Sequence, residues 1–355
     1  MTDDKRMHFI RNIEALESNN EKGKITQEYE VIADAYITGE FTYGPYYFTI
    51  WDYGFEEEGE RRRLCLRICK SISSPEELPQ SAKKSEFYHG GGIADELVAL
   101  SSLFLRRRLQ LGPIVRCNDK PKVLGKNKGL IDKPLIVGQR SLSELPEWLK
   151  LVEKLDARYH QRFILAAKLY SQALLLIEEQ PDMAYLNLVS AIEALCSSYD
   201  TGIKEIASSY PNLAHIITQV EPKEVREKLE KELLNVLYFT KKSFVKFVLD
   251  HIEKTFWDES ERGPKFARIQ PEELENILKR VYDQRSKTLH TGEPFPPFTS
   301  YGMGEEIPLG MISGGKRWER QDLVPNPHLF ERLVNHVLKT YLKRNSHNND
   351  YLHSG

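Results

Sequence analysis

The chain has little of what marks several large protein classes. Its four cysteines, Cys65, Cys69, Cys117 and Cys196, include no Cys-x-x-Cys pair, so neither a zinc ribbon nor a disulfide scaffold is expected. No segment approaches the roughly 18 apolar residues of a membrane span. The charged N-terminus, MTDDKRMHFIRNIEALE, lacks the apolar run of a signal peptide. We therefore expect a cytoplasmic protein with reduced thiols and no membrane partner.

Neither positive nor negative charge is in large excess. The formal net charge is -2, so any site for a polyanion must be a local patch rather than a generally basic surface. The sequence contains no Gly-x-x-x-x-Gly-Lys-Ser/Thr loop, no Gly-x-Gly-x-x-Gly fingerprint and no His-Glu-x-x-His pair. It has no internal repeat or paired metal-site carboxylates either. No cofactor and no metal are therefore expected.

What is present is the composition of an ordinary globular protein. Hydrophobic residues make up 40% and charged residues 29% of 355 residues, enough for a buried core and two domains. The sequence pattern changes near residue 147, where mixed strand and helix signals give way to almost wholly helical periodicity. We predict an α+β chain with a mixed domain of unknown role over 1–146, a helical domain over 147–345 and a flexible tail over 346–355.

The N-terminal half mixes the two periodicities. A short helix is predicted over about 5–18, two or three strands within 29–54, and another strand over 61–72. Apolar residues at helical spacing predict a helix over 93–111, stopped by Gly112-Pro113. The aromatic stretch from Tyr43 to Tyr53 fits either a sheet core or a recognition surface.

The C-terminal half predicts a bundle of five or six helices. The predicted helices cover 147–179, 181–196, 223–256, 272–289 and 328–344, and the third of them is either continuous or broken near Thr240. A Pro/Gly-rich loop is expected over 292–327.

One short motif combines two chemically active side chains. Arg285 and His290 lie five positions apart near the end of an amphipathic helix that Gly292 and Pro294 stop. Arginine is a permanent cation with a fork of donors that matches phosphate, and histidine exchanges protons near neutral pH. Together they are the minimum needed to cleave an RNA backbone without a metal. Five positions on a helix correspond to a rotation of about 140°, so the two side chains do not share one face.

Arg285 lies on the packed stripe of its helix, where an unpaired charge would be costly. Glu193, within the apolar helix YLNLVSAIEALC, is its plausible counter-charge if that carboxylate is buried. Glu193 would then hold Arg285 in place. The alternatives are a Glu193 at the helix margin, an Arg285 paired with some core carboxylate and a His290 that only ends its helix.

Three lysines could add phosphate contacts. They are Lys241, Lys242 and Lys246 in the segment TKKSFVKF, and Lys287 beside the motif could join them. A run of charges more commonly forms a solvated helix face.

The order of these helices, with YLNLVSAIEALC followed by YDQRSKTLHTG, resembles the HEPN superfamily and most closely its Apea-like branch, found in prokaryotic defence proteins. The segment LVALSSLFLRRRLQLGP also looks like one that precedes the HEPN core in that branch. The resemblance covers about residues 95–112 and 155–345.

The resemblance implies an all-α domain that forms homodimers. Active members are metal-independent endoribonucleases with an Arg-x(4–6)-His motif, here Arg285 and His290, and the two motifs of a dimer line one cleft. Many active members carry Asn, Asp or His directly after the arginine. This sequence has Ser286 there, which orients the site less strongly, and Lys287 follows it. The implied setting is anti-phage defence or a toxin-like system, with RNA as substrate and an antitoxin or defence protein as a possible partner. Other members are non-catalytic modules that bind RNA, a nucleotide or a protein, and this alternative stays open.

Overall fold

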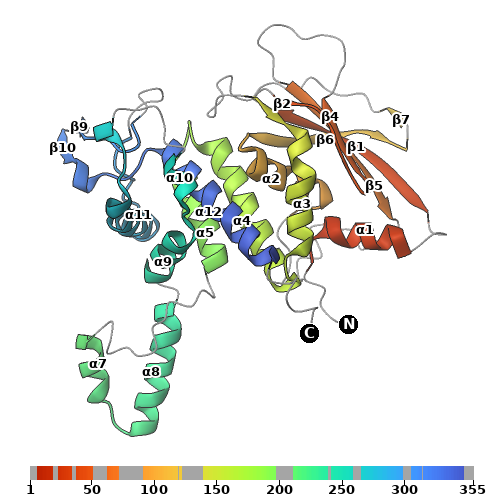
Figure 1. Cartoon of the computed structure of the whole chain (residues 1–355). Coiled ribbons are helices and arrows are strands. Elements are labelled where there is room, and N and C mark those ends of the chain that lie inside the picture. Colours follow the sequence, from red (N-terminus) through yellow and green to blue (C-terminus); the bar gives the residue numbers. More distant parts are fainter. Residues whose placement is uncertain are drawn as a thin grey trace. The chain divides into compact units, whose positions relative to one another are not determined.

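A computed structural model of the chain describes residues 6–18, 23–33, 37–50, 62–71, 91–118, 120–121, 139–196, 211–238, 241–258, 265–298, 305–313 and 315–347. The fold is α+β, as the sequence predicts, with an antiparallel sheet in the N-terminal part and mostly helices after it (Figure 1). The chain forms two compact units, Met1–Asn187 with Leu338–Gly355, and Leu188–Val337. None of the described helices combines the length and the apolar content needed to cross a lipid bilayer.

The first unit contains a six-stranded sheet with antiparallel neighbours. Its central strand β1 (Lys24–Ala33) pairs with β5 (Arg62–Ser71) on one side and with β6 (Leu109–Cys117) on the other. A parallel pair of short strands, β2 (Ile37–Thr38) and β8 (Arg140–Ser141), stands apart from it. The order across the sheet is β3 (Phe41–Tyr43), β4 (Tyr46–Ile50), β5 (Arg62–Ser71), β1 (Lys24–Ala33), β6 (Leu109–Cys117) and β7 (Lys120–Pro121). The predicted strands are confirmed within the described parts of 29–54 and 61–72, although β1 begins earlier, at Lys24, and the first range contains four strands where two or three were expected; residues 51–54, 61 and 72 lie outside the described residues.

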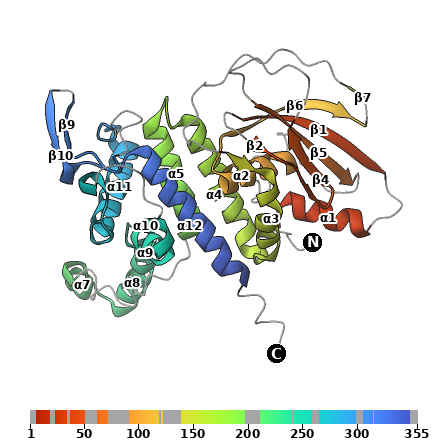
Figure 2. The same ribbon diagram turned by 45° about the horizontal axis from the view of Figure 1, so that its top comes forward.

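One face of this sheet is the core of the first unit. Residues alternate between the two faces of a strand, and Val31, Leu64, Leu66 and Phe48 have exposed fractions of at most 1%. Helices α1 (His8–Ser18), α2 (Ile93–Leu105) and α3 (Leu145–Lys154) lie against one side of the sheet (Figure 2). Tyr46 and Phe48 are buried in this core, whereas Tyr47 between them lies on the opposite face, and residues 51–53 of the aromatic stretch lie outside the described residues.

A buried carboxylate fixes α1 to α2. Glu96 of α2 is fully buried and accepts the backbone N–H groups of His8 and Phe9 at 2.9 Å each. These donors belong to the first turn of α1, where a helix has no backbone acceptor of its own and where negative charge is favourable. The Glu96 side chain therefore accepts from two backbone N–H groups that have no acceptor within α1.

The first unit extends past the expected domain boundary at residue 146. Helix α2 packs on α4 (Ala157–Leu176), and the Ser346 hydroxyl donates to the Leu151 carbonyl at 2.7 Å. The single helix predicted over 147–179 is instead α3 and α4, because Asp156 caps α4 by accepting the Arg158 N–H. Residues 348–355 of the expected tail lie outside the described residues, and 346–347 belong to α12 (Pro327–His347).

The prediction of a helix over 93–111 was wrong at its C-terminal end. Helix α2 stops at Leu105, because Arg106 adopts a left-handed conformation with a φ of 50°. Gly112 then lies inside strand β6, where neighbouring residues pair with β1. Local spacing favoured a helix, whereas pairing with a strand about 80 residues earlier favours β6.

The second unit is mostly helical. It contains the end of α5 and the start of α12, and a two-stranded hairpin lies between Gly310 and Glu319, where only a loop was expected. Of the two alternatives for 223–256, the structure describes separate helices, α8 (Lys223–Tyr238) and α9 (Lys241–His251), and residues 239 and 240 lie outside the described residues. The elements in chain order are α5 (Pro181–Cys196), α7 (Pro211–Thr218), α8 (Lys223–Tyr238), α9 (Lys241–His251), α10 (Lys254–Asp258), α11 (Pro271–Thr291), β9 (Gly310–Ser313), β10 (Lys316–Glu319) and α12.

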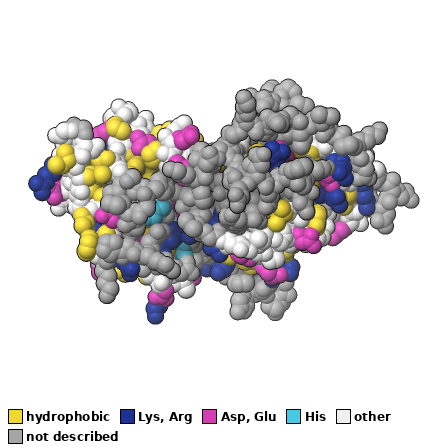
Figure 3. Space-filling view, turned by 90° about the horizontal axis from the view of Figure 1, so that it is seen from above, with side chains coloured by type: hydrophobic (Ala, Val, Ile, Leu, Met, Phe, Trp, Pro, Cys, Tyr) yellow, Lys and Arg dark blue, Asp and Glu magenta, His cyan; other side chains and the backbone are white. Residues whose placement is uncertain are grey.

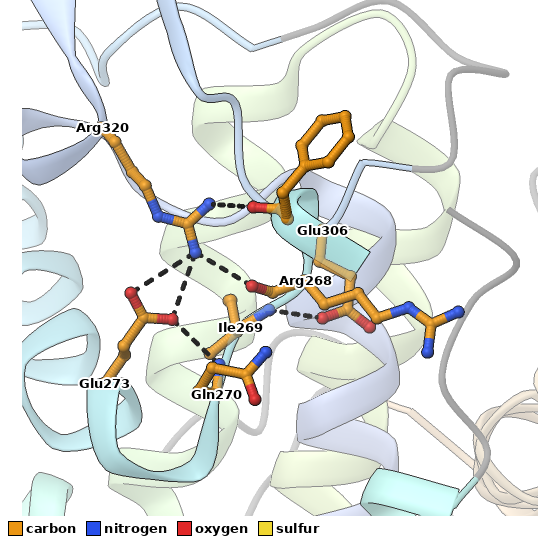
Figure 4. A network of polar contacts seen from close by, with 7 residues as sticks. Arg268, Ile269, Gln270, Glu273, Glu306 and Arg320 are labelled. Carbon is orange, nitrogen blue, oxygen red and sulfur yellow. Dashed lines mark hydrogen bonds and ion pairs between the residues drawn. The ribbon is translucent and has the colours of Figure 1, made fainter. Parts of the chain in front are cut away.

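A polar network anchors the start of α11 (Figure 4). Arg320 donates to the carbonyls of Phe266 and Arg268 and to the Glu273 carboxylate, at 2.9–3.2 Å. Glu273 in turn accepts the backbone N–H of Gln270, the residue before α11, at 2.9 Å. The Glu273 carboxylate in the first turn of α11 thus fixes where the helix begins. Arg320, directly after the hairpin, holds this carboxylate in place.

Candidate functional site

Helix α11 carries the Arg285/His290 motif, and its sequence specifies both ends. Pro271 occupies the first turn, where a missing N–H costs nothing. Gly292 ends the helix in a left-handed conformation with a φ of 71°, and its N–H bonds the Thr288 carbonyl at 3.1 Å. The chain then folds back, since Gln284 donates to the Pro294 carbonyl at 2.8 Å. This stretch is fixed from both sides of the helix end.

Arg285 is paired with Glu193 of α5. Its Nη2 atom lies 2.6 Å from Glu193 Oε2, and the two side chains have exposed fractions of 21% and 24%. Both residues belong to the second unit. The ion pair that the two packed stripes suggested is therefore present, whereas its role in chemistry stays a prediction. Arg285 Nε is buried and has no hydrogen-bond partner among the described residues.

Tyr282 completes this cluster, and the sequence analysis did not single it out. The Arg285 guanidinium carbon lies 5.8 Å from the centre of the Tyr282 ring, within the range of a cation–π contact. Burial, and next the neighbouring Glu193 charge, raise the pKa of Tyr282 to about 12. The Phe244 ring of α9 packs on the Tyr282 ring, and the two ring centres are 5.3 Å apart. The available signal was the position of Tyr282, three residues before Arg285 on one helix.

Cys196 lies one turn after Glu193 on α5. Burial, and next the Glu193 charge, raise the pKa of its thiol to about 12. A thiol that stays protonated is a poor nucleophile and metal ligand. Cys196 is therefore part of the packing around Glu193, and it does not supply a reactive group.

His290 is placed differently from Arg285. It lies exposed in the last turn of α11, and the helical rotation of about 140° between the two positions directs them apart. The structure thus brings Arg285 to Glu193 and Tyr282, but it does not bring His290 to them. Nearby, Ser286 is half-buried and Lys287 is exposed, and neither side chain bonds to another described residue.

The three lysines of α9 lie on the helix that packs against α11. Lys241 pairs with Asp283 of α11 at 2.5 Å, and Lys246 pairs with Asp250 of its own helix at 2.6 Å. Lys242 is exposed. Lys241 and Lys246 are therefore partly neutralised, which is the arrangement of a solvated face. Figure 3 shows, among the described residues on the side it presents, Lys and Arg side chains close to Asp and Glu side chains.

Within the described part of the chain, no group of His, Cys, Asp and Glu side chains is arranged to hold a metal ion. Comparisons with protein-family models, with curated proteins and with solved structures found no match to this chain. The residues and their geometry are therefore the ground for a functional proposal.

Proposed function

We propose that the chain is a metal-independent endoribonuclease of the HEPN type, acting in the cytoplasm in anti-phage defence or a toxin-like system. One observation carries the proposal. A guanidinium held by Glu193 and an exposed histidine lie on the same helix, at the Arg-x4-His spacing. Arg285 has five N–H donors, and Glu193 binds the guanidinium through Nη2, so the group is oriented while part of the side chain stays open to solvent.

The chemistry follows from these two residue types. His290 accepts the proton of a ribose 2′-hydroxyl, and the 2′-oxygen attacks the adjacent phosphorus. The bond from phosphorus to the 5′-oxygen breaks, and the leaving oxygen takes a proton from a second histidine. The products are a 2′,3′-cyclic phosphate and a 5′-hydroxyl end. Arg285 stabilises the negative charge that builds on the phosphoryl oxygens.

The separation of the two side chains around α11 favours a site shared between two copies. One copy offers a single motif histidine, whereas the reaction needs both a base and an acid. A homodimer supplies two histidines and two arginines, and each pair can then meet across the dimer axis without sharing one helix face. The orientation of Arg285 by Glu193 is compatible with such a composite cleft.

A second function is supported by the same ion pair. Glu193 already neutralises Arg285 at 2.6 Å, and a guanidinium that keeps this partner can bind an anion without catalysing its cleavage. A non-catalytic module that binds RNA, a nucleotide or a partner protein such as an antitoxin therefore stands as the alternative.

The test incubates purified protein with a mixed RNA in EDTA. Cleavage by wild type, with no cleavage by His290→Ala or Arg285→Lys, is the expected result. His215→Ala is the matched control, because His215 is also exposed near the end of a helix, α7. Fragments must carry 2′,3′-cyclic phosphate ends, and DNA of the same sequence must stay intact.

The composite site has its own test. Mixing wild type with an excess of His290→Ala places the wild-type copies in heterodimers that have a single motif histidine, so the activity per wild-type copy should fall, whereas an excess of His215→Ala should leave it unchanged. Light scattering gives the oligomeric state, and a monomer that cleaves RNA contradicts the shared cleft. RNA binding without cleavage under any condition favours the non-catalytic module.

A further inference from the structure

The second face of the six-stranded sheet carries a row of charged side chains. Tyr47 of β4, Arg67 of β5, Glu28 of β1 and Arg116 of β6 are successive partners across neighbouring strands. Directly paired residues point to the same side of a sheet, and neighbouring strands lie about 4.8 Å apart. The four side chains thus form one row on the face opposite the apolar core.

The carboxylate in this row lies beneath the arginines. Arg67 Nε donates to Glu28 Oε1 at 2.7 Å, and Arg116 Nε lies 3.3 Å from Glu28 Oε2. The Glu28 side chain is 8% exposed, whereas Arg67 is 50% and Arg116 is 35% exposed. Solvent therefore meets the guanidinium groups, and the carboxylate serves to hold them in place.

The same arrangement repeats along the strands. Arg63 lies 3.3 Å from Glu30, with exposed fractions of 50% and 3%. Lys24 is exposed at the start of β1, on the same face by the alternation of the strand. Within the described strands this face therefore has four cations against two carboxylates, and both carboxylates are the buried partners. Among the described strand residues of this face, the charge that reaches solvent is positive, although the whole chain is slightly acidic.

An aromatic ring lies at the end of the row. The Arg67 guanidinium carbon is 5.8 Å from the centre of the Tyr47 ring. The Tyr47 hydroxyl donates to Glu40, in the turn before β3. A tyrosine ring beside guanidinium groups gives a surface on which a base can stack while its phosphates contact cations.

We propose that this sheet face binds a single-stranded nucleic acid, with Lys24, Arg63 and Arg116 contacting phosphates and Tyr47 stacking on a base. An acidic protein segment would use the cations but would gain nothing from the ring. The donors meet phosphates rather than base edges, so affinity depends little on sequence. Binding here requires no cleavage, and the inference therefore does not rest on the proposed ribonuclease activity.

The experiment measures fluorescence anisotropy of a labelled 12-nucleotide 2′-O-methyl RNA, which has no free 2′-hydroxyl to react. DNA of the same sequence shows whether the sugar matters. The full chain is compared with Lys24→Gln/Arg63→Gln and with Tyr47→Leu. The matched control, Lys150→Gln/Arg158→Gln, removes two exposed cations from α3 and α4 of the same unit.

The double sheet variant should weaken binding about tenfold and lower the slope of log affinity against log salt by roughly 1.4, the value for two lost phosphate contacts to a single strand. Tyr47→Leu should weaken binding at least about fivefold with little change in slope. Glu40→Gln should strengthen binding. Circular dichroism checks folding, and Lys24→Gln alone serves if the loss of Arg63 unfolds the protein, since Lys24 is exposed.

Three results overturn the proposal. In the first, the sheet variants bind the RNA as tightly as wild type. In the second, the control variant loses as much affinity as the double sheet variant. In the third, Tyr47→Leu has no effect, and a polyglutamate peptide of equal charge displaces the probe as well as unlabelled RNA does. The last result assigns the face to an acidic protein segment. None of these outcomes depends on whether the protein cleaves RNA.

Discussion

Arg285 and Glu193 form an ion pair of 2.6 Å between α11 and α5, and about a fifth to a quarter of each side chain is exposed. Removing one partner from such a pair leaves a partly buried charge without compensation. The pair therefore holds the candidate catalytic arginine and also contributes to the stability of the second unit.

Replacing Glu193 by Gln should lower the free energy of unfolding by about 1–2 kcal/mol, because an amide oxygen accepts a hydrogen bond from Arg285 but carries no charge. Urea denaturation measures the change. Glu147→Gln is the control, since Glu147 pairs with Lys150 at an exposed position, and a surface pair contributes about 0.5 kcal/mol or less. Equal effects for the two variants would falsify a special role for Glu193.

Tyr282 should be energetically coupled to Glu193. The variant Tyr282→Phe keeps the ring near Arg285 and removes only the hydroxyl, whose pKa the Glu193 charge raises. We expect a loss of about 1 kcal/mol in the free energy of unfolding, and a much smaller loss when Glu193 is already Gln. A double-mutant cycle by urea denaturation gives the coupling. Effects that simply add, within about 0.3 kcal/mol, show that the hydroxyl acts independently of Glu193.

The sequence predicted the helices around the candidate site and the Arg285–Glu193 pair, because a charged residue on an otherwise apolar stripe requires a partner. The same logic missed Tyr282. An aromatic residue on an apolar stripe also fits a core, so its spacing of three residues from Arg285 was not decisive, and only the position of its ring beside the guanidinium shows the contact.

The elements that could not be predicted depend on non-local pairing. The end of the segment after Leu105 keeps a helical apolar spacing, yet its partner β1 lies far earlier in the chain. The hairpin between Gly310 and Glu319 lies in a Pro/Gly-rich stretch, and its four-residue strands have too few residues for a periodic signal. The sheet face that carries Arg67 and Arg116 likewise requires the strand order, which one sequence does not specify.

Gly292 should be sensitive to substitution for a purely conformational reason. Its φ of 71° is strained for a residue with a side chain, whereas a Cβ atom there would have no neighbour within 4 Å. Gly292→Ala should therefore cost about 1 kcal/mol of unfolding free energy, and Gly292→Asn less, since asparagine tolerates the left-handed region better. Urea denaturation of both variants checks the order. An alanine variant as stable as wild type contradicts the assigned end of α11.

His160 should make the first unit less stable in mild acid. The side chain is 2% exposed, its Nε2 atom bonds the Leu155 carbonyl at 2.7 Å and must therefore carry the proton, and Nδ1 is buried without a partner among the described residues. Burial lowers the pKa of His160 from its ordinary value of 6.5, although the Leu155 carbonyl and the Glu96 charge oppose the shift.

The sign of the pH dependence follows from that direction. In the unfolded chain His160 takes up a proton as the pH falls through about 6.5, while in the folded chain it stays neutral until a lower pH. The unfolded state thus binds more protons in this interval, and stability must fall as the pH is lowered from 7 through the folded pKa. His160→Gln removes the titrating group, so urea denaturation at pH 7 and at pH 5.5 should show a smaller loss for the variant than for wild type. Equal losses in the two proteins would mean that other groups account for the acid sensitivity.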